Sequence, residues 1–420
     1  MQADAATLRT VYDAAIAASV ATETHQLPGH ERFPAFEGIR AMAALAIVAF
    51  HAGTYTGLTG PGGGVAGSWA RHLNVGVSVF FVLSAFLLYR PFVKAHLADE
   101  AAPKLRPYLA RRFVRIFPAY WLALFVTATV LHQAVLGDWW GKLRFYSLTQ
   151  IYWADTALGG LPQAWSLCTE LSFYLFLPFW AYLMARAGGT VARRRRIHLL
   201  GCAVLYVGAL LFRAQLRAGH HALGYAWLPA NTDLFALGMW LAVVSADASV
   251  RTVEPGGLWR TVGDWPGISW LAAACAYWAV VHMGFPFEFL QTPTASQEVV
   301  RQALFGGVAL LLVAPGVVGR QNEGWIRRML ESRVLWSIGV VSYGVYLWHL
   351  TVMSRLNDWL RPDPVPGHVQ APVSWWVLTL GTIVFSLLVA AVSWFALERP
   401  TLRWVRRDRP AEAGGRRRVL

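Results

Sequence analysis

Residues 36–52 read F-E-G-I-R-A-M-A-A-L-A-I-V-A-F-H-A, an apolar run that carries Arg40 near its start and His51 near its end. A run of this kind predicts a helix that crosses a membrane. The two basic residues are eleven positions apart, close to three helical turns, so they share one face about 16 Å apart along the axis. Ionisable groups at bilayer depth are costly and are therefore functional candidates. The structural alternatives are an Arg40 that snorkels to the interface and a His51 that bonds a neighbouring helix.

Similar apolar stretches recur along the chain as far as residue 398. Apolar residues make up 56% of the 420 positions and charged residues only 14%, whereas a soluble domain carries about 25% charge. Mean hydropathy is +0.41. We predict an all-α membrane protein, a polytopic bundle of about ten transmembrane helices with both termini in the cytoplasm. The predicted spans are 36–57, 74–93, 113–136, 162–184, 197–215, 228–247, 267–284, 298–319, 334–354 and 372–398.

The net charge of +14 comes from basic residues in short segments between spans, and we expect no nucleic-acid partner. With the N-terminus inside, 28 of the 37 Lys and Arg residues fall in predicted cytoplasmic segments, as in positive-inside membrane proteins. The three cysteines lack metal spacing, so we expect no metal site and no disulfide framework. We divide the chain into a cytoplasmic tail at 1–35, a transmembrane domain at 36–398 and a basic cytoplasmic tail at 399–420. The first tail lacks an apolar core, so we expect no cleavable signal peptide.

Arginines cluster around the start of the third predicted span, where residues 106–120 read R-P-Y-L-A-R-R-F-V-R-I-F-P-A-Y. Arg111 and Arg115 are four residues apart and share a helical face at the predicted cytoplasmic surface. Guanidinium groups grip phosphates well, so these two residues and Arg112 are candidates for holding a ligand that carries phosphates. Ordinary anchoring of a positive-inside protein is the alternative.

An acid lies within the fourth predicted span, where residues 165–174 read W-S-L-C-T-E-L-S-F-Y. Glu170 and Tyr174 are one turn apart and share a face. A buried acid needs a partner, which Arg40 or His51 could supply. An interhelical ion pair without chemistry is the alternative.

A second buried histidine follows in the ninth predicted span, where residues 342–349 read S-Y-G-V-Y-L-W-H. His349 lies towards the predicted outer half of the bilayer. Its neighbours Tyr346 and Trp348 are also typical of an aromatic belt at the membrane interface. A functional histidine and an anchoring belt both stay open.

These segments together resemble the acyltransferase-3 family of integral-membrane acyltransferases, over roughly residues 33–400. The family shows, in order, R-x10-H, F-F-x-x-S-G, R-x-x-R-I-x-P-x-Y, W-S-L-x-x-E-x-x-F-Y, Y-G-x-Y-L-W-H and E-x-P. Each motif alone is weak, but six in this order within one ten-helix plan are specific. The matching residues are Arg40 and His51; Phe80, Phe81 and Ser84; Arg112, Arg115, Ile116, Pro118 and Tyr120; Trp165, Ser166, Leu167, Glu170, Phe173 and Tyr174; Tyr343 through His349; and Glu398 and Pro400.

The resemblance implies an O-acyltransferase that moves a short acyl group, most often acetyl, from cytosolic acyl-CoA to a hydroxyl. Acyl-CoA, chiefly acetyl-CoA, is then a co-substrate, and we expect no bound cofactor. We expect the CoA phosphates at the arginines, and the donor-binding residues to be Arg111, Arg112, Arg115, Ser84, Phe80 and Phe81. The residues expected on the acceptor side are His349, Trp165 and Tyr346.

For the chemistry, His51 is expected to act as general base on the acceptor hydroxyl or as a transient acyl carrier. Arg40 and Glu170 would orient and charge-balance this histidine. Tyr174 would donate a hydrogen bond to the developing oxyanion.

The sequence departs from the family pattern at two positions. Ala85 replaces the glycine of F-F-x-x-S-G, and is expected to narrow a close approach between helices and to reshape the acyl pocket. Leu171 occupies a position where many members carry a second acid, which removes one candidate from a proton network. Some relatives carry a hydrolase-like domain after the membrane domain; we expect none, because the tail ends in a basic run.

The expected partners are the acyl-CoA donor, a carbohydrate, glycolipid or related envelope or secreted acceptor, and the lipid bilayer. The expected location is the bacterial inner (plasma) membrane, crossed many times. A proton-coupled transporter of a small acid or sugar is the alternative function, since it also needs buried ionisable residues. Matching broken helices in two inverted halves would favour a transporter, and the sequence shows no such symmetry. A scaffold without chemistry would leave the buried ionisable residues without a purpose.

Overall fold

The computed structural model describes residues 33–219, 221–253, 255–285, 293–320, 323–361 and 373–407, with the side chains of residues 222 and 404–407 left out. Most of the predicted tail at 1–35 and the chain beyond residue 407 therefore lie outside the described residues. The compact unit that begins at Pro34 holds every helix described below.

The described residues form helices joined by turns and contain no strand, which confirms the predicted all-α class. Short 3-10 or π turns, labelled η, begin or end several helices. The α-helices are α2 (Ala35–Tyr55), α3 (Gly64–Arg71), α4 (Val75–Ala98), α5 (Leu105–Phe125), α6 (Trp139–Tyr146), α7 (Trp165–Ala185), α8 (Val191–Ala218), α9 (Leu228–Arg251), α10 (Leu258–Asp264), α11 (Pro266–His282), α12 (Ala295–Val313), α13 (Trp325–Leu330), α14 (Arg333–Val340), α15 (Ser342–Leu360), α16 (Trp375–Ser393) and α17 (Arg399–Arg407). The shorter turns are η1 (Pro61–Gly63), η2 (Val126–Val130), η3 (Gln150–Tyr152), η4 (Pro162–Ala164), η5 (Ala222–Ala226), η6 (Ala314–Gly316) and η7 (Trp394–Glu398).

The number of membrane spans is slightly smaller than predicted. Eight helices of the described chain are long and apolar enough to cross a bilayer, or nine if α14 and α15, which meet at a 70° bend, form one span. The difference from ten lies at α11, which has 17 residues. Such a helix is about 26 Å long, shorter than a hydrocarbon core of about 30 Å. The protein is thus a multi-pass membrane protein.

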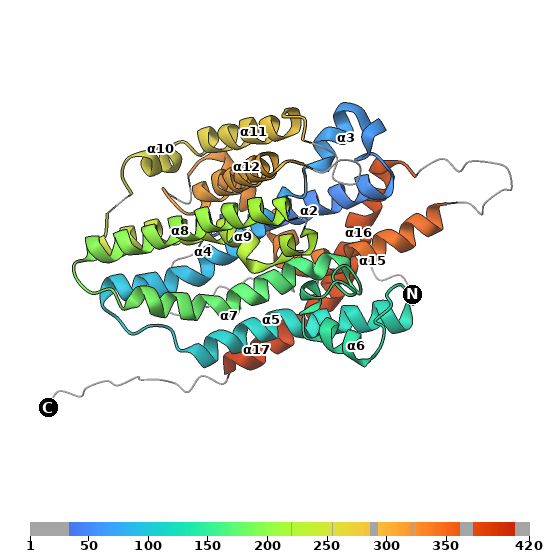
Figure 1. The fold of residues 1–420 in the computed structure, drawn as a ribbon, viewed down its shortest axis with the longest axis horizontal. Coiled ribbons are helices and arrows are strands. Elements are labelled where there is room, and N and C mark those ends of the chain that lie inside the picture. The colour runs from blue at the N-terminus through green and yellow to red at the C-terminus, as the bar shows by residue number, and fades with distance from the viewer. Residues whose placement is uncertain are drawn as a thin grey trace, which may run out of the picture. The chain divides into compact units, whose positions relative to one another are not determined.

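The ends of consecutive helices define two sides of the bundle. On one side α4 turns into α5 and α7 turns into α8, whereas α2 ends and α16 begins on the other (Figure 1). The first two turns touch, because His96 Nε2 lies 3.1 Å from the carbonyl oxygen of Ala187. We name this the basic side, after the arginines at the start of α5, and the other the opposite side. Which side faces the cytoplasm stays a prediction.

A glycine lets α9 pack directly against α4. A Cβ atom on Gly238 would lie 2.1 Å from the carbonyl oxygen of Val82 and 2.8 Å from Cβ of Ala85, so no larger residue fits there. Ala85 is fully buried in this contact. Ala85 replaces the family glycine on α4, and Gly238 on α9 leaves room for its methyl group. The two helices therefore still pack closely.

Candidate active site

A narrow cavity of about 60 Å³ lies between α2, α4, α5, α7 and α15. Five helices from distant parts of the sequence contribute side chains to it, so only the folded bundle creates it. Ala85 is not among the lining residues, so the predicted reshaping of the pocket by this alanine is not seen. Eight residues predicted for the site do line it, namely Arg40, Phe80, Phe81, Ser84, Arg115, Glu170, Tyr174 and Tyr346.

Glu170 is the centre of the hydrogen bonds in this cavity. Oε1 of its carboxylate accepts a short hydrogen bond from Ser84 Oγ and another from the Tyr174 hydroxyl at 2.5 Å. Tyr174 reaches the acid because it lies one helical turn further along α7. Its hydroxyl proton is committed to Glu170, so the predicted hydrogen bond to an oxyanion would require this contact to break.

The arginines of α5 lie between the Glu170 carboxylate and the basic side. Arg115 lines the cavity, and the guanidinium carbon of Arg112 lies 5.9 Å from the centre of the Tyr174 ring. The Nε atom of Arg112 is buried and has no hydrogen-bond partner among the described residues. Arg111 is half-buried on the same helix, four residues before Arg115. The three arginines thus lead from the start of α5 to the cavity.

His51 lies apart from this cavity and pairs with the other predicted histidine. Its Nδ1 atom is 3.0 Å from the carbonyl oxygen of Ile47 and 3.1 Å from Nε2 of His349. His349 is fully buried, and its own Nδ1 lies 2.6 Å from the carbonyl oxygen of Tyr346. Arg40 pairs instead with Glu37 at 2.7 Å. Within the described chain neither Arg40 nor Glu170 hydrogen-bonds His51.

These contacts fix the tautomers of both rings when they are neutral. A carbonyl oxygen only accepts, so Nδ1 of His349 carries the hydrogen and Nε2 carries the lone pair. Nδ1 of His51 faces two acceptors, the Ile47 oxygen and that lone pair, so it must also carry the hydrogen. Nε2 of His51 is then unprotonated and makes no hydrogen bond to the described residues. His51 is arranged to accept a proton at this atom.

Tyr346 connects the cavity with the histidine pair. It lines the cavity, and its ring centre lies 5.8 Å from that of His349 and 6.2 Å from that of Phe80. The Tyr346 hydroxyl is held between Ser166 Oγ and the carbonyl oxygen of Gln163, each at 2.6 Å. Ser166 and Gln163 therefore fix the residue whose backbone orients His349.

Gln163 is a site residue that sequence reasoning missed. Its side chain is 2% exposed and donates a hydrogen bond of 2.6 Å from Nε2 to the carbonyl oxygen of Leu347. Together with the contact to Tyr346, this holds the α15 turn that precedes His349. The available signal was a polar residue two positions before Trp165, at the start of a span. Trp165 itself packs edge-on against Phe81, with ring centres 6.2 Å apart.

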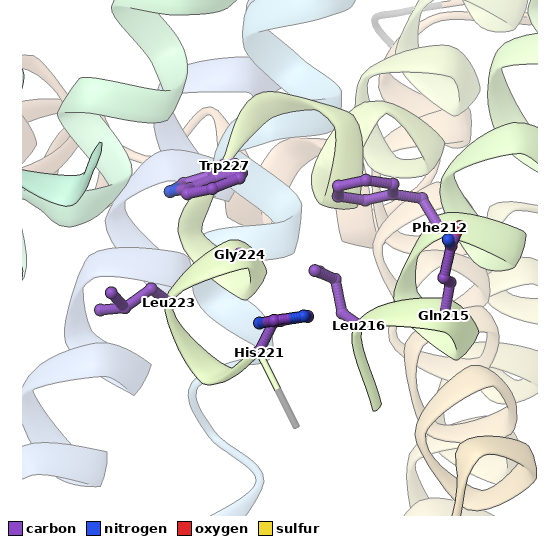
Figure 2. Close-up of a pocket in the computed structure, with 7 residues that line it drawn as sticks. All are labelled: Phe212, Gln215, Leu216, His221, Leu223, Gly224 and Trp227. Atoms are coloured by element: carbon purple, nitrogen blue, oxygen red, sulfur yellow. The ribbon is translucent and has the colours of Figure 1, made fainter. Parts of the chain in front are cut away.

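A second and much larger hollow of about 610 Å³ lies elsewhere, between the end of α8 and η5. Figure 2 shows the side chains around it, with Phe212 and Gln215 from α8 on one side and Trp227 and Leu223 from the η5 segment on the other. It contains none of the predicted site residues. Among the described residues no group of three or more His, Cys, Asp or Glu side chains is placed to hold a metal ion. The smaller cavity and the histidine pair are therefore the candidate active site.

Comparison with known protein families agrees with this assignment. A family model described as "Acyltransferase domain" matches residues 33–394, a range that holds both the cavity and the histidine pair. The chain belongs to the acyltransferase-3 family. The six motifs of this acyltransferase-3 chain place residues in the cavity, at the histidine pair and at Glu398, which is buried in η7.

Curated relatives of this acyltransferase-3 chain are distant. "Putative O-acetyltransferase SACOL0978" of Staphylococcus aureus (strain COL) is 22% identical over 360 residues, which are 80% of this chain and 53% of that protein. "Putative peptidoglycan O-acetyltransferase YrhL" of Bacillus subtilis (strain 168) is 21% identical over 398 residues, 90% of this chain and 56% of that protein. "Acyltransferase MdmB" of Streptomyces mycarofaciens is 26% identical over 400 residues, which are 90% of this chain and 94% of that protein. The chain spans about half the length of the first two. No solved structure matches it.

Proposed function

We propose that this protein transfers a short acyl group, acetyl, from acyl-CoA to a hydroxyl of a carbohydrate, glycolipid or related envelope or secreted acceptor. The family supports acyl transfer as the reaction class. The names of the relatives support oxygen as the receiving atom, since two of them are called O-acetyltransferases. We place the protein in the bacterial plasma membrane with both termini inside.

The observation that carries this proposal is the free Nε2 atom of His51. Its Nδ1–H is held by Ile47 and His349, so the lone pair on Nε2 is the base available to a hydroxyl. In catalytic triads a carboxylate holds the Nδ1–H of the histidine. Here the neutral, buried ring of His349 does so. Neutral partners suit a buried site, because they add no net charge at bilayer depth.

The reaction balances with these groups alone. The O–H bond of the acceptor breaks as its proton passes to Nε2 of His51, and the oxygen forms the new C–O bond to the acyl carbon. The C–S bond of the thioester breaks with its electron pair on sulfur. His51 then returns its proton to the CoA thiolate. If Nε2 attacks the thioester first, the C–S bond breaks as the N–C bond forms, and the same atom becomes a transient acyl carrier. The acceptor oxygen then displaces Nε2 from the acyl carbon, and the acceptor proton passes to the CoA thiolate.

The donor is proposed to enter from the basic side. Its phosphates would lie at Arg111, Arg112 and Arg115, and its pantetheine arm would point through the cavity towards Tyr346. Arg40 and His51 are about 16 Å apart along α2, a gap that an extended pantetheine arm can bridge. The cavity walls at Phe80 and Phe81 suit the apolar part of a short acyl group.

The acceptor is proposed to be a cell-envelope sugar. B. subtilis YrhL is named a peptidoglycan O-acetyltransferase, which makes glycan hydroxyls the first class to test. A small secreted metabolite is the second class.

Purified protein in proteoliposomes should release CoA thiol from acetyl-CoA over many turnovers only when an acceptor is added. We expect label from radioactive acetyl-CoA in soluble peptidoglycan fragments or in a polyprenyl-linked glycan. Mass spectrometry of envelope glycans and lipids, with and without the gene, should show an acetyl mass difference. The absence of both thiol release and any acyl mass difference would contradict the proposal.

A further inference from the structure

All the hydroxyl side chains of α16 face the inside of the bundle. The helix is otherwise strongly apolar, with a mean hydropathy of 2.2 over its span. Thr379, Thr382, Ser386 and Ser393 are each 5% exposed or less. The residues between them form the lipid face and are more than half exposed, namely Val377, Leu380, Val384, Leu388 and Val392. A helix with all its hydroxyls on its buried face has a polar stripe along one seam.

Three of these hydroxyls have no hydrogen-bond partner among the described residues. They are Oγ1 of Thr379, Oγ1 of Thr382 and Oγ of Ser386. The Oδ1 atom of Asn357 on α15 is also buried without a hydrogen-bond partner among the described residues. Buried Ser and Thr on a helix ordinarily bond the carbonyl four residues earlier. Buried polar atoms without protein partners are the groups that ordered water satisfies.

The three hydroxyls lie on the buried face of α16, and Asn357 lies on α15, which packs against α16. The helices run antiparallel, because Gly344 packs against Ala390 and Gly381 packs against Leu356. With this register Thr379 lies opposite the turn that holds Asn357, and Ser386 lies opposite the turn that holds His349. The polar atoms therefore run from the opposite side of the bundle to the depth of the histidine pair.

We propose that this seam binds a single file of water that reaches from the opposite side to the depth of His349. An apolar cluster of Val48, Ala52, Val345, Met353, Leu378 and Ala390 fills the same region. A broad opening is therefore excluded, and the proposed water is limited to a single file beside the unpartnered polar atoms. The histidine pair then communicates with water on the side away from the arginines. The file does not depend on the proposed function; only its use in acyl transfer does.

Cysteine labelling tests the file directly. A background without Cys168, Cys202 and Cys275, the cysteines present, receives one cysteine at Ser386 or Thr382. Matched controls carry it at Leu388 or Val384, two residues further along on the lipid face. Right-side-out and inverted membrane vesicles are treated with Ag⁺, which is about as small as water, and the remaining thiols are counted with a maleimide after denaturation.

Ser386→Cys and Thr382→Cys should react about tenfold faster than their controls, because the reactive thiolate forms only where water reaches it. By the predicted topology the difference should appear in right-side-out vesicles. Equal rates at the buried and lipid-facing positions would overturn the proposal. So would faster reaction of the buried positions in inverted vesicles only, if reporter fusions place the opposite side outside the cell. Labelling needs no turnover, so its failure is separate from a failure of acyl transfer.

Thermal stability supplies a second test, because the change in Tm on removing a hydroxyl has one sign if water bonds that hydroxyl and the other sign if nothing does. Thr382→Val keeps the shape and removes the hydroxyl. If water bonds that hydroxyl, Tm should fall, whereas removal of an unsatisfied buried hydroxyl should raise Tm. The control is Thr54→Val at an exposed site of α2, where the hydroxyl bonds Phe50. A rise in Tm for Thr382→Val beyond the control would refute the water file.

Discussion

His51 and His349 are 298 residues apart in sequence, yet Nδ1 of the first lies 3.1 Å from Nε2 of the second. The pair joins α2 to α15, four residues before α2 ends at Tyr55. The orientation of His51 depends on two backbone carbonyls, that of Ile47 directly and that of Tyr346 through His349. This relationship makes the roles of both histidines testable by substitution.

His51→Ala should abolish transfer while leaving membrane insertion and acyl-CoA binding intact. Loss of a general base typically lowers the rate by about 10²–10⁴-fold. His51→Gln should not restore it, because an amide cannot take up the proton. Product formation in proteoliposomes, with donor binding followed by calorimetry, checks this. More than about a tenth of wild-type turnover would remove His51 as the base and make His349 the leading candidate.

His349→Gln and His349→Leu should differ in severity. The glutamine oxygen can still accept the Nδ1–H of His51, so we expect a modest fall in kcat. The leucine leaves that Nδ1–H with only the Ile47 oxygen and should cost more, with a shifted pH profile of kcat. Equal kcat and pH profiles for both variants would show that His349 does not hold His51 during turnover.

Arg112→Ala with Arg115→Ala should raise the KM for acyl-CoA more than it changes kcat. Each charge-assisted contact contributes on the order of 1.5–3 kcal/mol, which corresponds to about ten- to a hundredfold in affinity. Arg106→Ala is the matched control, since this residue lies on the same helix but is exposed. Unchanged donor affinity in a correctly inserted double variant would refute phosphate binding at this place.

Glu170→Gln should be mild and Glu170→Leu severe. The amide oxygen of glutamine can accept the two hydrogen bonds that Ser84 and Tyr174 now donate to the carboxylate. Leucine leaves both hydroxyls buried without this partner, at a cost of about 1–3 kcal/mol each. Thermal unfolding in detergent and turnover should fall together for the leucine variant. A leucine variant as stable as the wild type would argue against this network.

Reporter fusions test the predicted orientation. Fusions after residues 65 and 158 should report the outside, and those after residues 100 and 190 the inside, because basic residues concentrate next to the latter. Enzymatic reporters that work on only one side of the membrane give the measurement. A cytoplasmic signal at residue 158 would invert the plan for α5 and α7.

The sequence predicted individual helices well because each follows a local rule. Apolar length marked the spans, and buried ionisable residues marked Arg40, His51, Glu170 and His349. Helical spacing also predicted the contact between Glu170 and Tyr174, since one turn of helix fixes it.

Contacts between helices could not be predicted from apolar length or helical spacing. Nothing in the spacing of α2 indicates that His51 meets His349 rather than Glu170, because the tilt and rotation of each helix decide this. Gln163 was missed for the same reason, since its role depends on two carbonyl groups of another helix. The span at 334–354 was predicted as one helix, whereas the structure has a 70° bend between α14 and α15.

A cavity of about 60 Å³ is several times smaller than the roughly 300–1,000 Å³ of ordinary ligand pockets. A thioester with its pantetheine arm fits there only after the surrounding side chains move apart. Arg40 and Tyr346 belong to α2 and α15, so entry of the proposed donor would part these helices briefly. Helix motions of this kind take microseconds to milliseconds. The rate of turnover would then be limited by the separation of these helices. A stiffer bilayer would lower that rate without altering the reactivity of His51.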